Sequence, residues 1–265
     1  MKPRLPLLLF LAACCSVSVR ADVVTLGADK DNAIINGANV NNSNGGAPAF
    51  FSGTDGNSAI HRALISFDFS TIPAGSTITD VRLTLTLGQV ASGGATTATI
   101  GLFGVTKNWG EGTANSGIAG IAGSGAGVAA GAGDATWNAA AFPGTLWATP
   151  GGDHAVAASA SLFLPNNTVN NSFTWLSTPQ SVADVQGWLD NPATNFGWEL
   201  INGNEVTAKT IYGFYSREWS NLHFGGNASQ VPALQVTFTA PVPEPSAFLL
   251  MGVAGFSLLT LRRRA

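Results

Sequence analysis

The sequence predicts an all-β protein, an antiparallel β-sandwich with one short helix. Segments of period-two alternation recur through the middle of the chain, and glycine-rich turns separate them. Charged residues make up only 10% of the chain. Helix formers such as Glu, Lys, Arg and Met are scarce, which argues against a helical bundle.

Charge is distributed unevenly along the chain. Residues 1–21 carry three basic side chains and no acidic one, and residues 241–265 carry three arginines against Glu244. Residues 22–240 hold 6 basic and 14 acidic side chains, a net charge of −8. A body this acidic, with so few basic residues, argues against a nucleic-acid partner. The two basic ends need separate interpretations.

The first 21 residues have the layout of a secretory signal peptide. A basic start precedes an apolar run from Leu5 to Ala13, and small residues lead to Ala21, the expected cleavage site. An alternative is lipidation, because residues 11–14 also resemble a bacterial lipoprotein cleavage site that would make Cys14 the first residue. Cleavage after Ala21 removes both cysteines, so the mature chain would have no disulfide and no thiolate site.

Residues 22–240 are expected to form one β domain. Strand alternation is clearest in residues 62–69, 78–87 and 234–239. One face of each strand is expected to be buried and the other half-exposed, as in antiparallel sandwiches. In 62–69 this places Ile65 and Phe67 in the core and Leu64 on the half-exposed face. Turn residues separate the strands at 72–75, 92–94 and 202–204.

Two segments depart from the strand pattern. Residues 112–133 are a Gly/Ala/Ser tract without charge and are predicted to be a flexible surface loop. A short helix is predicted to begin at Thr178-Pro179 and to end at Asn191-Pro192. Its apolar face contains Val182, Val185, Trp188 and Leu189, and we expect it to close one mouth of the sandwich.

The C-terminus combines a proline motif, an apolar run and an arginine cluster: Pro243-Glu244-Pro245, then residues 246–261, then Arg262, Arg263 and Arg264. The apolar run is predicted to be a transmembrane segment, although it is shorter than the roughly 20 residues that span a bilayer comfortably. The arginines predict that its far end stays cytoplasmic. The prolines hold the preceding backbone extended, as a protease cleft requires.

This tail, residues 241–265, resembles the PEP-CTERM sorting signal of Gram-negative bacteria that make extracellular polysaccharide. The resemblance implies that a membrane-embedded exosortase recognises Pro243, Glu244 and Pro245. It also implies an inner-membrane intermediate, followed by release to the cell surface or to the extracellular polysaccharide matrix.

The body, residues 22–240, resembles a DNRLRE-type domain. Six motifs occur in the family's order: residues 62–68 with the turn 72–75, then Trp109-Gly110-Glu111-Gly112, 135–138, 184–188 with 195–198, Tyr215-Ser216-Arg217-Glu218, and 232–236. The resemblance implies a jelly-roll β-sandwich. Some relatives are carbohydrate-binding modules, so it also implies binding or adhesion and no catalysis.

Seven tryptophans raise the question of sugar stacking. Three lie in periodic segments and are expected to be buried: Trp175, Trp188 and Trp198. Four lie near loops and are the candidate glycan contacts: Trp109, Trp137, Trp147 and Trp219. Core packing or loop anchoring is the alternative for these four. The acidic body favours a neutral polysaccharide over an anionic one.

Metal-binding and catalytic patterns are sparse. Asp29, Asp31 and Asn32 offer oxygen ligands that a structural calcium ion could use, although Asx-rich turns without metal look the same. No other cofactor is expected. His61, His154 and His223 lack metal-ligand spacing and are expected to be ordinary surface or edge residues.

The sequence therefore predicts an exported, non-enzymatic protein with a structural or adhesive role through weak polysaccharide binding. No Gly-x-Ser-x-Gly nucleophile elbow is present. The alternative is a secreted polysaccharide-active enzyme, a glycosidase or lyase, because paired carboxylates cannot be located from sequence. Glu111 and Glu218 are expected to be structural, each pairing with loop amides or with an arginine such as Arg62 or Arg217.

Overall fold

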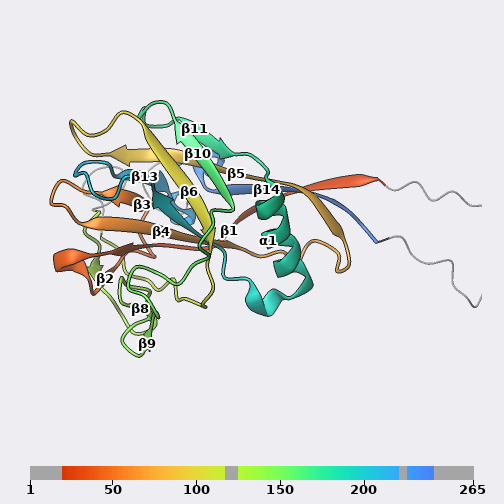
Figure 1. Ribbon diagram of the computed structural model, residues 1–265, viewed down its shortest axis with the longest axis horizontal. Coiled ribbons are helices and arrows are strands. Elements are labelled where there is room, and N and C mark those ends of the chain that lie inside the picture. The colour runs from red at the N-terminus through yellow and green to blue at the C-terminus, as the bar shows by residue number, and fades with distance from the viewer. Residues whose placement is uncertain (1–19, 117–124, 221–225, 242–265) are drawn as a thin grey trace, which may run out of the picture.

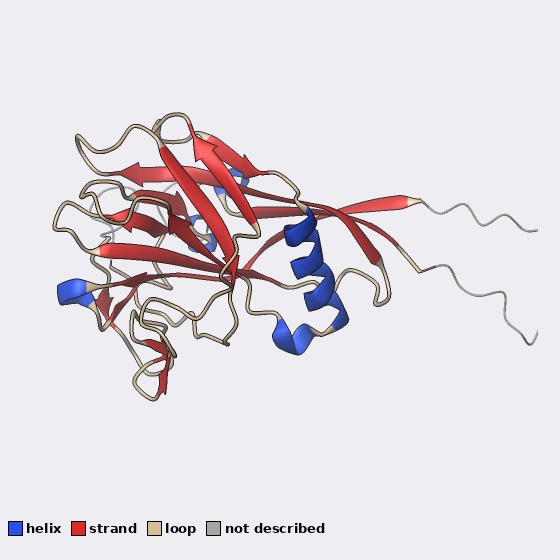
Figure 2. Ribbon diagram, viewed as in Figure 1, coloured by secondary structure: helices blue, strands red, loops and turns tan. Residues whose placement is uncertain are grey.

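The protein is described by a computed structural model that covers residues 20–116, 125–220 and 226–241. Strands make up 41% of the structure and helices 12%. The prediction of an all-β sandwich is therefore confirmed (Figures 1 and 2).

Ten strands form one continuous antiparallel network in the order β1-β14-β5-β13-β3-β4-β12-β6-β10, with β11 joined to β5. Their bounds are β1 (Ala21–Ile35), β3 (Ala49–Thr54), β4 (Ile60–Phe67), β5 (Thr77–Val90), β6 (Ala98–Gly104), β10 (Ala160–Leu164), β11 (Ser172–Trp175), β12 (Trp198–Asn202), β13 (Tyr212–Tyr215) and β14 (Ala233–Thr239).

Strand β1 belongs to both layers of the sandwich. Its first half pairs with β14, from Ala21 opposite Thr239 to Gly27 opposite Ala233. A register shift between Ala28 and Lys30 then turns the strand, and its second half pairs with β4. One layer consists of β1, β14, β5 and β11, and the other of β1, β4, β12, β6 and β10. Strands β3 and β13 connect the two.

The main core lies between these layers and follows the predicted alternation. On β5 the inward residues Val81, Leu83, Leu85 and Leu87 are buried, whereas Arg82 is exposed. Trp175 and Trp198 join this core, which confirms the prediction for both. Burial of each such large side chain contributes on the order of 2 kcal/mol.

A second, smaller core covers the outer face of β4. Leu64 is fully buried there, against Ile34, Val105, Trp109, Ala135, Ala140 and Trp147. The expectation of a half-exposed outer face was therefore wrong for Leu64. The segment between β6 and β10 folds back over this face, and a period-two pattern cannot reveal such a cover.

Two short antiparallel strand pairs involve this covering segment, and in the first of them the partner strand comes from the chain between β1 and β3. Strand β2 (Asn42–Ser43) pairs with β7 (Val128–Ala129), and β8 (Ala139–Ala141) pairs with β9 (Thr145–Leu146). Within the predicted loop 112–133, the described flanks are therefore attached to the fold. Gly46 N also donates to Ala114 O at 2.8 Å. Residues 117–124 lie outside the described part.

The predicted helix is present as α1 (Pro179–Asp190). Thr178 caps it, because its hydroxyl accepts from Ser181 N and the Ser181 hydroxyl accepts from Thr178 N in a capping box. Val185, Trp188 and Leu189 are buried, and the Trp188 ring packs on Trp198 with centroids 4.8 Å apart. The 3-10 turns are η1 (Gly37–Asn39), η2 (Pro192–Thr194), η3 (Arg217–Ser220) and η4 (Ala228–Gln230).

Both ends of the described chain leave the sandwich on the same side, where β1 and β14 run next to each other (Figure 1). Residues 1–19 of the predicted signal peptide and the predicted transmembrane segment 246–261 lie outside the described residues. Within the described ranges, no helix is long and apolar enough to cross a membrane.

Candidate functional site

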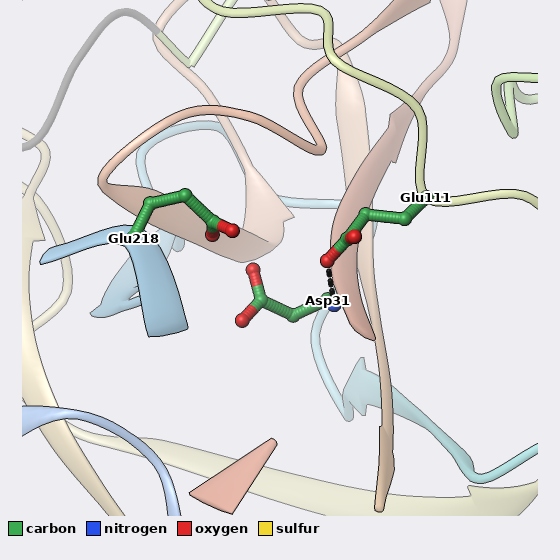
Figure 3. Close-up of side chains that lie close together, drawn as sticks. All are labelled: Asp31, Glu111 and Glu218. Carbon is green, nitrogen blue, oxygen red and sulfur yellow. Dashed lines mark hydrogen bonds between the residues drawn. The ribbon is translucent and has the colours of Figure 1, made fainter. Parts of the chain in front are cut away.

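Three acidic side chains from distant parts of the chain converge in the structure. Asp31 comes from β1, Glu111 from the loop after β6, and Glu218 from η3. One carboxylate oxygen of each lies within 4.8 Å of the others. In Figure 3 the Glu111 and Glu218 side chains point toward Asp31 from opposite sides. We call these three residues the acidic cluster.

Glycines place Glu111 in this cluster. A Cβ at Gly110 would lie 1.8 Å from Gly133 O, and one at Gly112 would lie 1.8 Å from an Asp134 carboxylate oxygen. Gly112 also has a φ of +74°, which disfavours any side chain. The Trp-Gly-Glu-Gly motif is thus a close backbone passage that fixes the glutamate. Glu111 Oε1 then accepts from Asp31 N at 2.8 Å.

Arg217 is the cation at the centre of the cluster. Its Nε and Nη2 donate to both carboxylate oxygens of Glu111 at 2.7 and 2.6 Å. Its Nε also lies 2.9 Å from Glu218 Oε1, and its backbone N–H donates to Asp31 Oδ2 at 2.8 Å. This confirms the expected pairing of Glu111 and Glu218 with an arginine. Lys30 instead donates to Trp109 O at 3.0 Å.

One arginine against three carboxylates leaves an excess of negative charge. Burial raises the pKa of Asp31 well above its usual range, and the Glu218 carboxylate raises it further. Burial also raises the pKa of Glu218 to about 7, against the opposing effect of Arg217. Glu218 Oε2 is buried and has no hydrogen-bond partner among the described residues. The acidic cluster can therefore bind a proton or a second cation with little free-energy penalty.

The geometry suits cation binding better than glycoside hydrolysis. A glycosidase needs two carboxyl groups with a substrate between them, and a free oxygen on each. Both oxygens of Glu111 already accept from Arg217, and the carboxylates converge on one another. Calcium prefers several carboxylate oxygens at one point, which Asp31 and Glu218 can supply with Glu111 beside them.

The predicted calcium ligands are brought together only in part. Asp31 belongs to the cluster, but Asp29 is exposed and lies outside it. Asn32 is buried and holds the fold together instead: its Oδ1 accepts from Ala33 N and Asn44 N, and its Nδ2 donates to Ser43 Oγ. The expectation for Asp29 and Asn32 is therefore corrected. Asp29 lies at the register shift between Ala28 and Lys30, and Asn32 follows Asp31 on the strand, where successive side chains point to opposite faces.

For the four candidate glycan contacts, the structure supports core packing or loop anchoring instead of exposure. Trp109, Trp147 and Trp219 are only 3 to 5% exposed. Each indole N–H is committed to the protein: Trp109 donates to Phe196 O, Trp147 to Thr136 O and Trp219 to Gln230 Oε1. Trp137 is half-buried and stacks under the Arg62 guanidinium, 5.3 Å from Cζ to the ring centroid. These rings anchor loops, so they form no common platform.

Of the two described histidines, His61 differs from the expected surface or edge position and His154 agrees with it. His61 is fully buried on β4, and burial lowers its pKa to about 4 against the opposing Asp55. His154 is partly exposed, with Nε2 3.9 Å from the buried carboxylate of Glu199. His223 lies outside the described residues. Neither described histidine takes part in the acidic cluster.

Two family models match parts of the chain. Residues 22–116, from β1 through β6 to the loop after Glu111, match the model of carbohydrate-binding module family 96. Residues 241–264 match the PEP-CTERM protein-sorting motif. These matches support a PEP-CTERM protein with a carbohydrate-binding-module-like domain. A search of curated proteins found no match to the chain.

Proposed function

We propose that this protein is exported, processed by an exosortase and held at the cell surface or in the extracellular polysaccharide matrix, where weak carbohydrate binding gives it a structural or adhesive role. The sorting motif supports export and processing, and the module match supports carbohydrate binding. Residues 22–240 would fold as the functional unit after cleavage at Ala21.

The structural observation behind this proposal is that the two ends of the described chain leave the domain side by side. Ala21 pairs with Thr239, so the predicted cleavage site and the start of the sorting tail lie next to each other. Strand β5 begins opposite Thr239 and runs for 14 residues away from that end, about 45 Å. A tail fixed in a membrane would hold the domain by one end and leave the other free.

The proposed activity is binding without catalysis, as is usual for such modules. The runner-up, a glycosidase or lyase, would need a free acid and base in an open cleft. The acidic cluster offers a glutamate with a pKa near 7, but its partner Glu111 is held by Arg217 at both oxygens. The arrangement supports a structural role for the cluster.

A glycan microarray probed with the full chain in detergent tests the proposal. We expect retention on neutral polysaccharides with micromolar to millimolar affinity and no release of reducing ends from those that bind. Absence of retention on every glycan contradicts the binding claim. Steady release of reducing ends or of unsaturated sugars supports the enzyme instead.

We also propose that the acidic cluster binds calcium as a structural ion. The support is the convergence of three carboxylates around one arginine, with Glu218 Oε2 left without a partner in the described structure. Millimolar calcium should raise the unfolding temperature at pH 8, and much less at pH 5, where Glu218 is protonated. An equal rise in an Asp31→Asn, Glu218→Gln double variant contradicts this site.

A further inference from the structure

The outer face of β10, β6 and β12 carries an aromatic side chain that no part of the fold covers. Phe163 on β10 is 58% exposed, and it is the one aromatic residue among the strongly exposed large apolar side chains of the described chain. β10 is the last strand of the sheet order, and Phe163 lies opposite Thr99 on β6. Its ring contributes little to the core and is accessible to a ligand.

A glycine keeps the adjacent surface flat. Gly101 lies on the same face of β6 as Thr99 and Phe103, because Ile100 and Leu102 point into the core. A Cβ on Gly101 would come within 2.7 Å of the Phe103 ring. The half-buried Phe103 ring therefore lies close to Gly101, which is in register with Ser161 of β10 and Ile201 of β12.

A pocket of about 280 Å³ adjoins Phe163. Its walls are the Phe163 ring, threonines, asparagines and small residues, with no charged side chain: Ala95, Thr97, Ala98, Thr99, Phe163, Asn202, Gly203, Asn204 and Thr210. The volume lies just under the roughly 300 Å³ at which pockets for drug-sized ligands begin. One sugar ring with its substituents is a ligand of that scale.

The polar groups of this pocket are held in place. Asn202 is buried, donates from Nδ2 to Thr210 O at 2.9 Å and accepts at Oδ1 from Asn204 N at 2.9 Å. Asn204 is exposed, and its Oδ1 accepts from Thr207 N at 3.1 Å, which fixes the position of its amide group. Thr97 and Thr99 are also exposed and offer hydroxyl groups.

This combination identifies the chemistry of the ligand. A pyranose ring has an apolar C–H face that packs on an aromatic ring and a rim of hydroxyl groups that bond to amides and hydroxyls. A uronate would need a basic group, and the lining supplies none. The match is therefore to an uncharged sugar.

The position of the pocket agrees with display on a membrane tail. Ala95 and Thr97 follow Val90, the end of β5 farthest from Thr239. A second pocket lies beside α1 and differs in charge and in position. Its lining includes the charged side chain of Asp68, and Ile72 and Pro73 place it just before β5 begins near Thr239.

We propose that Phe163, with the flat surface over Gly101 and the pocket formed by Thr97, Thr99 and Asn204, is the subsite that binds a neutral hexopyranose unit of a polysaccharide. This inference rests on the proposed carbohydrate-binding function and assigns that function to one face of the sandwich.

Affinity electrophoresis of the full chain in gels containing neutral polysaccharides tests the subsite. Phe163→Ala should weaken retention about tenfold, as expected for loss of an aromatic stacking contact. Phe163→Trp should retain the protein at least as well as the natural residue. Leu176→Ala is the matched control, because Leu176 is 63% exposed and follows β11 in the other layer. It should leave retention unchanged.

The outcomes separate this inference from the proposed function. Retention of the natural protein together with equal retention of Phe163→Ala overturns the subsite and leaves carbohydrate binding intact. Retention only by carboxylated polysaccharides overturns the assignment to an uncharged sugar. If the natural protein is retained by no polysaccharide, the proposed function fails and the subsite fails with it.

Discussion

At the scale of single residues, Arg217 connects parts of the chain that the sequence keeps far apart. Its backbone N–H reaches Asp31, 186 positions away, and its side chain neutralises Glu111. The ion pair of Arg217 with Glu111 is formed by charge-assisted hydrogen bonds, and each hydrogen bond of this kind contributes about 1.5–3 kcal/mol to stability. The remaining charge falls on Glu218, whose burial without a second cation is unfavourable.

This imbalance predicts a specific pH dependence. The folded pKa of Glu218, about 7, lies above its unfolded value of 4.5. The stability it contributes is therefore complete below pH 4.5 and is lost as the pH rises through 7. Glu218→Gln should remove that loss. Between pH 5 and 7.5, the free energy of unfolding of the variant should therefore rise by about 1–2 kcal/mol relative to that of the natural protein, after allowance for solvent screening.

Urea unfolding of residues 22–240, monitored by tryptophan fluorescence, measures the difference in free energy of unfolding between the natural protein and the variant. The measurement is made across this pH range without added calcium. His61 acts in the opposite direction, because its pKa is lowered to about 4 and its contribution is lost as the pH falls below 6.5. Both proteins contain His61, so its contribution cancels, and the difference reports Glu218 together with its effect on the pKa of Asp31. Parallel pH profiles would show that Glu218 carries no raised pKa.

At the scale of elements, α1 shows how local sequence signals determine a structure. The local sequence Thr178, Pro179 and Ser181 specifies where the helix begins. The Thr178 hydroxyl also donates to Ser159 O, which connects the cap to the residue just before β10.

Thr178→Ala should therefore lower the free energy of unfolding by about 1–2 kcal/mol, because it removes the cap and the tie to Ser159. Thr178→Ser keeps the hydroxyl and should restore most of that loss. Equilibrium unfolding in urea measures both variants. An alanine variant as stable as the natural protein would mean that packing of Val185 and Trp188 alone holds the helix.

Elements also show where sequence analysis succeeds and where it stops. The alternation of β5 and β14 identifies their inward residues correctly, because both strands have one face open to water. It fails at Leu64, because the covering segment after β6 buries a second face. Asp31 was predicted as a metal ligand, and Glu111 and Glu218 were predicted to pair with an arginine. Their convergence on Asp31 was not predictable, since it depends on long-range connections that no local spacing encodes. Tryptophans near loops proved to be anchors, and Phe163 carried no motif.

At the scale of the whole molecule, the fold brings the predicted cleavage site and the sorting tail to one end of the sandwich. Replacement of Pro243, Glu244 and Pro245 by alanine should leave the full-length protein in the inner membrane, because the extended recognition element is lost while the folded domain is unchanged. Cell fractionation with immunoblotting checks this, with Val242→Ala as the control. Normal processing of the triple variant would contradict recognition of this motif.

The central claim is that this domain binds carbohydrate at the surface it presents away from its tail. The most direct measurement is the mobility of the processed, exported protein in native gels with and without a panel of neutral polysaccharides. We predict retardation that grows with polysaccharide concentration for at least one of them, with a dissociation constant in the micromolar to millimolar range. Mobility equal to that in the blank gel for every polysaccharide would contradict the account.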